Sequence, residues 1–118
     1  MITTLIKNKE IREGTILFID EPEVNLHPKA IRILINFLVK IAKLGVQIFI
    51  SSHSYFVIKQ LTICAKKYNN SVFCYSLLKN NKGLINYNLS DLKDGLPDNP
   101  IVKEALDMYD EEIDLEFQ

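Results

Sequence analysis

Two short apolar runs stand out in the first half of the chain, and each ends abruptly in polar residues. The first run is Thr15 to Ile19, which Asp20-Glu21-Pro22 follows, and the second is Val46 to Ser51. Unbroken runs of β-branched and aromatic residues with this length predict strands that are buried on both faces, as in a parallel sheet. We therefore expect two buried, neighbouring parallel strands.

The residues between these runs follow the spacing of a helix. Pro28 suits the first helical position, because its fixed φ and missing N–H cost nothing there, and Gly45 suits the stop. Ile33 and Phe37 widen the apolar stripe, which predicts a helix that is covered on more than one side. The other apolar positions of the stripe are Ile31, Leu34, Ile35, Leu38 and Ala42.

A second helix is expected after the second run. Ser54 can cap it, and apolar residues then continue through Val57, Ile58, Leu61 and Ala65. A succession of strand, helix, strand and helix with short connections implies parallel strands and a right-handed crossover. Residues 1–12, which precede the first strand, are predicted to be a helix or the end of one.

The last third of the chain changes character. Two strand-like runs, 71–78 and 84–89, are joined by residues 79–83, which predicts a hairpin. Because this connection is too short for a parallel crossover, we expect the hairpin to extend the sheet as an antiparallel edge. Asn99-Pro100 opens a final helix through Tyr109, and the acidic tail beyond it is expected to be solvated and partly frayed.

These elements predict an α/β fold in which parallel strands with flanking helices precede a C-terminal β-hairpin and helix. We assign residues 1–118 to a single domain, with a core over 1–70 and the hairpin and final helix over 71–118. The 47% of apolar residues is normal for a globular chain, and the net charge of −1 gives no overall attraction to nucleic acid or anionic membrane.

The same composition bears on the compartment. Cys64 and Cys74 form no CxxC pair, so we interpret them as reduced thiols and expect no zinc site. Every apolar run is far shorter than the ~20 residues that a membrane span needs. We expect a cytoplasmic protein without a membrane partner.

Both predicted strands end in residues that carry chemistry. Asp20-Glu21 follows the first strand and Ser51-Ser52-His53 ends the second, and ligands of parallel sheets bind beyond such strand ends. One carboxylate there can hold Mg²⁺, a second can polarise a water molecule, and an imidazole can contact a γ-phosphate. In the alternative interpretation, Asp20-Glu21 only caps a strand and His53 is an ordinary loop residue.

The order of these segments resembles a known family. Residues 16–22 (Ile-Leu-Phe-Ile-Asp-Glu-Pro) resemble the Walker B motif of ABC-type ATPases, and residues 23–28 look like their D-loop in the "ExxLHP" form. Residues 48–54 resemble the switch-histidine segment, and residues 94–109 look like the end of such proteins. The ExxLHP form is typical of the OLD, RecF and SMC-related "AAA-like" members, which implies the C-terminal part of a P-loop NTPase fold.

The resemblance implies a role for each matching residue. Asp20 would hold Mg²⁺ through water, Glu21 would be the general base, and His53 would touch the γ-phosphate. It also assigns four residues to nucleotide binding, which are Asn25, Leu26, His27 and Ser52. The first three of them would lie across a dimer interface from the partner's nucleotide. ATP and Mg²⁺ are accordingly expected as ligands of the complete domain.

The phosphate-binding loop is missing from the chain. No G-x-x-x-x-G-K-[ST] segment occurs, and the four glycines lie too far apart to form one. The family's "LSGG-like" signature motif, which should lie just before the first helix, is absent as well. We therefore expect a fragment or truncated gene product, with a split gene product or a degenerate remnant as alternatives. The expected partners are the missing N-terminal ATPase lobe and a second copy, because exposed strand edges favour pairing in a homodimer or higher oligomer.

Three functions remain open at this point. The first is an ATP-binding and ATP-hydrolysing domain fragment of an ABC-type ATPase. The resemblance associates such ATPases with DNA repair or phage defence, and it implies that the complete protein contacts DNA. The second is a non-enzymatic remnant that acts as an oligomerisation or partner-docking module. A nuclease of the Toprim type would need a further acidic cluster such as DxD at a strand end, and no such cluster follows a strand.

Overall fold

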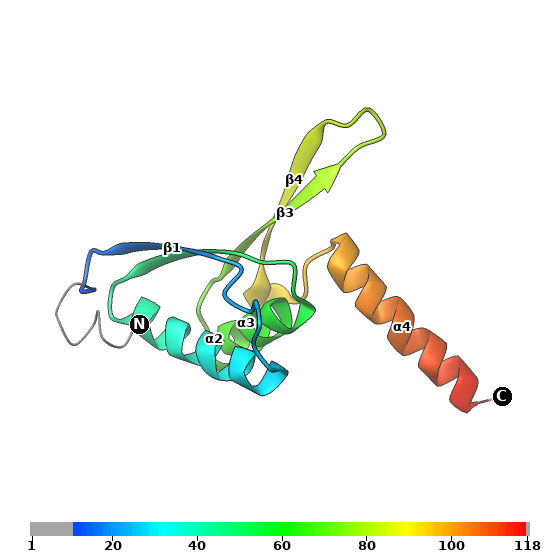
Figure 1. The fold of residues 1–118 in the computed structure, drawn as a ribbon, viewed down its shortest axis with the longest axis horizontal. Coiled ribbons are helices and arrows are strands. Elements are labelled where there is room, and N and C mark those ends of the chain that lie inside the picture. Colours follow the sequence, from blue (N-terminus) through cyan, green and yellow to red (C-terminus); the bar gives the residue numbers. More distant parts are fainter. Residues whose placement is uncertain (1–10, 118) are drawn as a thin grey trace. The chain divides into compact units, whose positions relative to one another are not determined.

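The computed structural model describes residues 11–117, so the helix expected over residues 1–12 lies almost entirely outside the described part (Figure 1). Contacts divide the chain into two compact units, Met1–Val57 and Ile58–Gln118. The assignment of residues 1–118 to one domain, with a boundary near residue 70, stays a prediction.

The first unit contains the predicted parallel strand pair. Strand β1 (Ile16–Asp20) lies parallel to β2 (Gln47–Ser51), and α2 (Pro28–Lys43) connects them. The register sets the two last residues, Asp20 and Ser51, opposite each other. This pairing confirms the expected parallel arrangement and places both strand ends at one edge of the sheet.

Helix α2 begins and ends where its sequence predicts. His27 is the N-cap, Pro28 follows at the first helical position, and Gly45 turns the chain at the far end with a φ of +97°. A Cβ added to Gly45 would lie 2.7 Å from the side chain of Glu13, so this turn requires glycine. The buried face of the helix, which contacts β2, consists of Ile31, Ile35, Leu38 and Ile41.

Two burial predictions for this unit are wrong. The strands are not buried on both faces, because Phe18 is 78% exposed and Phe49 46% exposed, and their rings stack with centroids 5.1 Å apart. Figure 1 shows α2 running along one side of the pair, so its cover reaches one face of the sheet. The helix is likewise not covered all round, since Ile33 is 61% exposed.

The next helix, α3 (Tyr55–Tyr68), starts directly after the end of β2. Ser54 caps it as predicted, because its Oγ accepts a hydrogen bond from the backbone N–H of Val57 at 3.4 Å.

Among the described residues, no helix is long and apolar enough to cross a membrane.

The second unit contains the predicted hairpin. Strand β3 (Phe73–Lys79) pairs antiparallel with β4 (Ile85–Asp91), and Asn80 Oδ1 accepts hydrogen bonds from the N–H groups of Lys82 and Leu84 in the turn, each at 2.9 Å. The expected attachment to the parallel sheet is wrong, because β3 and β4 form a separate two-stranded sheet. A hairpin closes its ladder locally, so its pairing does not depend on another strand's edge.

A short 3-10 turn, η1 (Leu92–Asp94), leads to helix α4 (Pro100–Glu116). Asn99 caps α4 by accepting a hydrogen bond from the N–H of Val102 at 2.9 Å. The acidic tail is exposed, as predicted, and it continues helix α4 to Glu116.

Candidate active site

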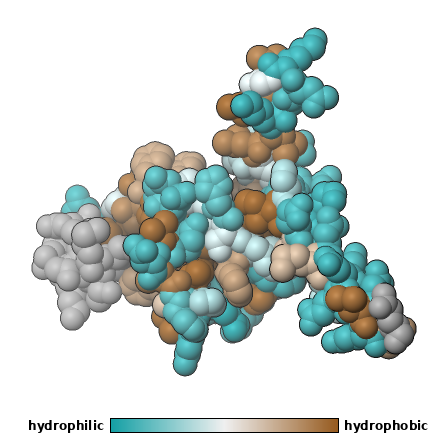
Figure 2. All heavy atoms as spheres, turned by 45° about the vertical axis from the view of Figure 1, so that its right-hand side comes forward, coloured by the Kyte–Doolittle hydropathy of each residue, from teal (hydrophilic) through white to brown (hydrophobic). Residues whose placement is uncertain are grey.

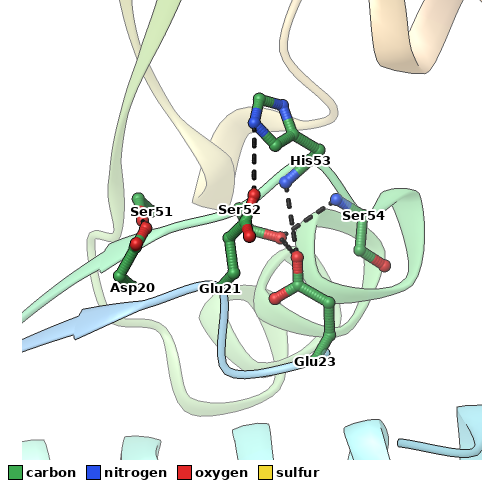
Figure 3. A network of polar contacts seen from close by, with 7 residues as sticks. All are labelled: Asp20, Glu21, Glu23, Ser51, Ser52, His53 and Ser54. Carbon is green, nitrogen blue, oxygen red and sulfur yellow. Dashed lines mark hydrogen bonds and ion pairs between the residues drawn. The ribbon is translucent and has the colours of Figure 1, made fainter. Parts of the chain in front are cut away.

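The carboxyl ends of β1 and β2 form a polar rim (Figure 3). Ser51 Oγ donates a hydrogen bond to Asp20 Oδ1, across the last pair of the parallel ladder. The backbone N–H of Glu21 donates to the Ser51 carbonyl at 2.8 Å, so the pairing continues one residue beyond Asp20. The strand ends thus fix the Asp20 carboxylate beside a hydroxyl at the sheet edge.

Glu21 and His53 face each other on the same rim. His53 Nε2 lies 3.4 Å from Glu21 Oε1, and their side chains are 86% and 40% exposed, with His53 the more open of the two. Glu21 has a left-handed backbone with a φ of +46°, which costs a residue other than glycine roughly 1 kcal/mol or more. This sharp turn separates the Glu21 carboxylate from that of Asp20 and brings it to the histidine.

Glu23 is a site residue to which sequence reasoning gave no role. Its Oε1 accepts hydrogen bonds from Ser52 Oγ at 2.7 Å and from the backbone N–H of His53 at 3.4 Å. Its Oε2 is buried without a hydrogen-bond partner in the described part of the chain. The signal that could have found Glu23 is its place as the first residue of the ExxLHP segment.

Ser52 links this carboxylate to the start of α3. Its Oγ donates to Glu23 and accepts from the backbone N–H of Ser54 at 3.0 Å, as drawn in Figure 3. Since Ser54 in turn caps α3, Glu23 and Ser52 hold the short connection that carries His53 between β2 and that helix. Ser52 therefore has a structural partner within the chain.

The other residues expected at the nucleotide are placed in the turn between β1 and α2. Asn25 has a left-handed φ of +65°, and Leu26 and His27 are exposed. His27 Nδ1 accepts a hydrogen bond from the N–H of Lys29 at 3.3 Å, which makes it the cap of α2. These three residues lie outside the network of Figure 3, and their nucleotide-binding role stays a prediction.

The donor set at the rim bears on which metal would fit. Within residues 11–117 no group of three or more His, Cys, Asp or Glu side chains could hold a metal ion. The Asp20 carboxylate and the Ser51 hydroxyl nevertheless offer hard oxygen donors at an exposed strand end. Mg²⁺ fits such a position, because it commonly takes one or two carboxylates and completes its shell with waters and substrate phosphates.

Together these features define an α/β protein with an acidic and histidine-bearing site at the carboxyl ends of parallel strands. Comparison with known proteins narrows this class. Residues 1–59, half of the chain, match the family described as "AAA domain, putative AbiEii toxin, Type IV TA system". The chain belongs to this AAA family, whose members have the P-loop NTPase fold.

A characterised relative is similar to part of the chain. The Old nuclease of Escherichia phage P2 is 46% identical over 43 residues, which cover 36% of this chain and 7% of that protein. The chain therefore corresponds to a small part of this relative's length. No solved structure matches the chain.

Proposed function

We propose that this chain supplies the water-activating half of an ATP-hydrolysing site in an ABC-type ATPase. The observation that carries the proposal is the pair of neighbouring strand ends, where Glu21 faces His53 at 3.4 Å beside the Asp20–Ser51 pair. Phosphoryl transfer to water is catalysed mainly by positioning and electrostatics, and these side chains lie at or directly after the ends of paired strands.

In this proposal the two adjacent acids have separate tasks. Asp20 would hold Mg²⁺, and the ion, when bound, would neutralise charge on the phosphates of ATP. Glu21 accepts a proton from the attacking water, since its carboxylate is partly exposed and turned away from Asp20 by the left-handed backbone. The neighbouring Ser51 hydroxyl orients the Asp20 carboxylate.

His53 is proposed to contact the γ-phosphate of ATP. Its side chain is 86% exposed, so the ring can reach a substrate, and its Nε2 atom already lies beside Glu21. An imidazole that touches both the general base and the terminal phosphate couples the position of the base to the presence of ATP. Glu23 positions this residue through the backbone N–H of His53.

The phosphates themselves need a loop that this sequence does not contain. We propose that the N-terminal lobe of the complete ATPase domain supplies it, and that the exposed Phe18–Phe49 pair lies where another layer covers the sheet. The similarity to the Old nuclease and the toxin–antitoxin family description support a phage-defence or DNA-repair setting, with DNA contact made by the complete protein.

The exposed phenylalanine pair also favours a second candidate, a docking module without catalysis. The two functions differ in what the rim residues do. A docking module would keep its binding partner when Asp20, Glu21 or His53 is replaced, and these replacements would change no turnover.

The test is made in the complete ATPase, with nucleotide affinity and turnover measured separately. Glu21→Gln is expected to abolish hydrolysis and keep ATP binding, because the amide is nearly isosteric and leaves Asp20 intact. Asp20→Asn is expected to weaken Mg²⁺-dependent binding as well, and His53→Ala to lower turnover with a smaller effect on binding. Unchanged turnover in all three variants would favour the docking module.

A further inference from the structure

The hairpin of the second unit turns its apolar face outward. Neighbours in the β3–β4 ladder share a face, so odd-numbered residues of both strands lie together. The six large apolar side chains of this face are between 53% and 71% exposed. They are Phe73, Tyr75, Leu77, Ile85, Tyr87 and Leu89.

The contact between the two tyrosines confirms that the set forms one surface. The rings of Tyr75 and Tyr87, which come from different strands, lie 5.8 Å apart between centroids. Figure 2 shows hydrophobic side chains gathered on the hairpin below its hydrophilic tip. We call these six side chains the aromatic face.

The opposite face of the hairpin is polar apart from Cys74 and Leu78, and the chain covers part of it. Ser76 is buried, and its Oγ accepts a hydrogen bond at 3.1 Å from Nδ2 of Asn99, which is buried as well. Asn99 also caps α4, so the polar face is fixed against the segment that begins this helix. The usual order, apolar inside and polar outside, is thus reversed in this hairpin.

An outward face of this size is a feature of interaction surfaces. Aromatic residues bury about 150–250 Å² each, so six large side chains that are more than half exposed present roughly 600 Å² per copy. A standard interface buries about 800 Å² per partner. The aromatic face together with a surrounding rim of polar residues would bury a similar area. Monomers rarely expose a contiguous patch of that size without a function.

The charges at the two ends of the aromatic face are complementary to those of a second copy. Lys79 stands at the tip end, opposite Ile85, and Asp91 stands at the base end, opposite Phe73. A two-fold axis that crosses the strands lays the tip of one copy over the base of the other, which brings Lys79 of each copy near Asp91 of the second copy. The surface is therefore complementary to itself, as an isologous interface must be.

We propose that the aromatic face is a homodimer interface, in which two hairpins pack face to face and antiparallel. This proposal does not rest on the ATPase function, and either can fail without the other. Its energy comes from burying aromatic and aliphatic surface, and the Lys79–Asp91 contacts set the orientation.

The first test compares one substitution on each face. Leu77→Lys places a charge in the middle of the aromatic face, and Asn86→Lys places the same charge on the exposed part of the polar face of the same hairpin. Sedimentation equilibrium of the full chain is expected to show a dimer, with a dissociation constant that Leu77→Lys raises roughly tenfold or more. Asn86→Lys is expected to leave that constant unchanged.

The second test uses the unaltered chain and does not depend on how a variant folds. Within one copy, Lys79 and Asp91 lie at opposite ends of strands that span about 20 Å, at about 3.4 Å per residue, so a zero-length amine-to-carboxylate crosslink cannot join them. A crosslink from Lys79 to Asp91, or to the exposed Asp94 beside it, must therefore connect two copies. Mass spectrometry of the crosslinked dimer is expected to find this link, and Lys79→Glu is expected to abolish it.

Two outcomes would overturn the proposal. One is a chain that stays monomeric at every concentration, which would mean that another surface or another protein covers the aromatic face. The other is an oligomer that Leu77→Lys leaves intact and that contains no Lys79 crosslink, which would place the interface elsewhere.

Discussion

Glu23 shows how much the candidate site depends on a residue that touches no predicted ligand. Its Oε1 binds Ser52 Oγ and the backbone N–H of His53, so it fixes the segment on which the histidine stands. A site that is loosened by even 1 Å can lose roughly 100-fold in rate. Glu23 is accordingly a positioning residue in the proposed reaction.

We predict that Glu23→Ala in the complete ATPase lowers kcat by roughly 10- to 100-fold and changes the KM for ATP little. The histidine loses its support, whereas Asp20 keeps its partner Ser51. Glu23→Gln is the matched control, because its carbonyl oxygen can still accept from Ser52 and from the N–H of His53, and it should restore most of kcat. Steady-state kinetics of the two variants would count against this role if both behaved like the parent.

At this scale the sequence predicted the rim because it depends on strand ends alone. Once two parallel runs end in Asp20-Glu21 and Ser51-Ser52-His53, the sheet must bring these residues to one edge. The role of Glu23 was not predictable in the same way. Its reach back to Ser52 follows from the left-handed turn at Glu21, and a sequence pattern does not contain that backbone angle.

At the scale of elements, the outlines of the helices and strands were predicted, but their surroundings were not. An unbroken apolar run looks the same whether one or both faces of its strand are covered, so Phe18 and Phe49 were expected to be buried. The hairpin 71–89 was recognised from its turn, yet its attachment depends on neighbours far away in the chain. Local signals define an element, and distant residues decide what covers it.

The base of the hairpin offers a prediction about pH. A hydrogen bond from the Ser71 side chain, together with bonds from the backbone N–H groups of Lys93 and Val72, holds the pKa of Asp91 below its ordinary value. Since the folded state lowers this pKa, the ionised carboxylate stabilises the fold above the unfolded pKa of about 3.9. That contribution is lost as the pH falls through the lower, folded value.

We therefore predict that Asp91→Asn lowers the thermal midpoint of unfolding at neutral pH, and that this difference shrinks below a pH of about 4 and disappears once the pH falls below the lowered pKa of Asp91. Asp94→Asn, which removes an exposed carboxylate nearby, is the control and should have little effect at either pH. Thermal unfolding followed by circular dichroism across this pH range makes the measurement. A difference between Asp91→Asn and the parent that stays constant down to low pH would show that the charge of Asp91 is not what matters.

At the scale of the whole molecule, the family match and the chemistry coincide in one part of the chain. Residues 1–59 carry the match to the AAA family, and the rim from Asp20 to His53 lies inside them. The second unit lies almost wholly beyond the matched segment and carries the aromatic face of the hairpin. The proposed division of labour is hydrolysis in the first unit and self-association in the second.

The central claim is that this chain contributes the water-activating residues and that an N-terminal ATPase lobe contributes the phosphate-binding loop. ATP turnover of the chain, alone and mixed with such an ATPase lobe, tests it most directly. We predict negligible turnover by the chain alone and measurable turnover when the lobe is added. With the Glu21→Gln chain, the mixture is expected to bind ATP but not to hydrolyse it. Hydrolysis by the Glu21→Gln mixture at the rate of the parent would contradict the account.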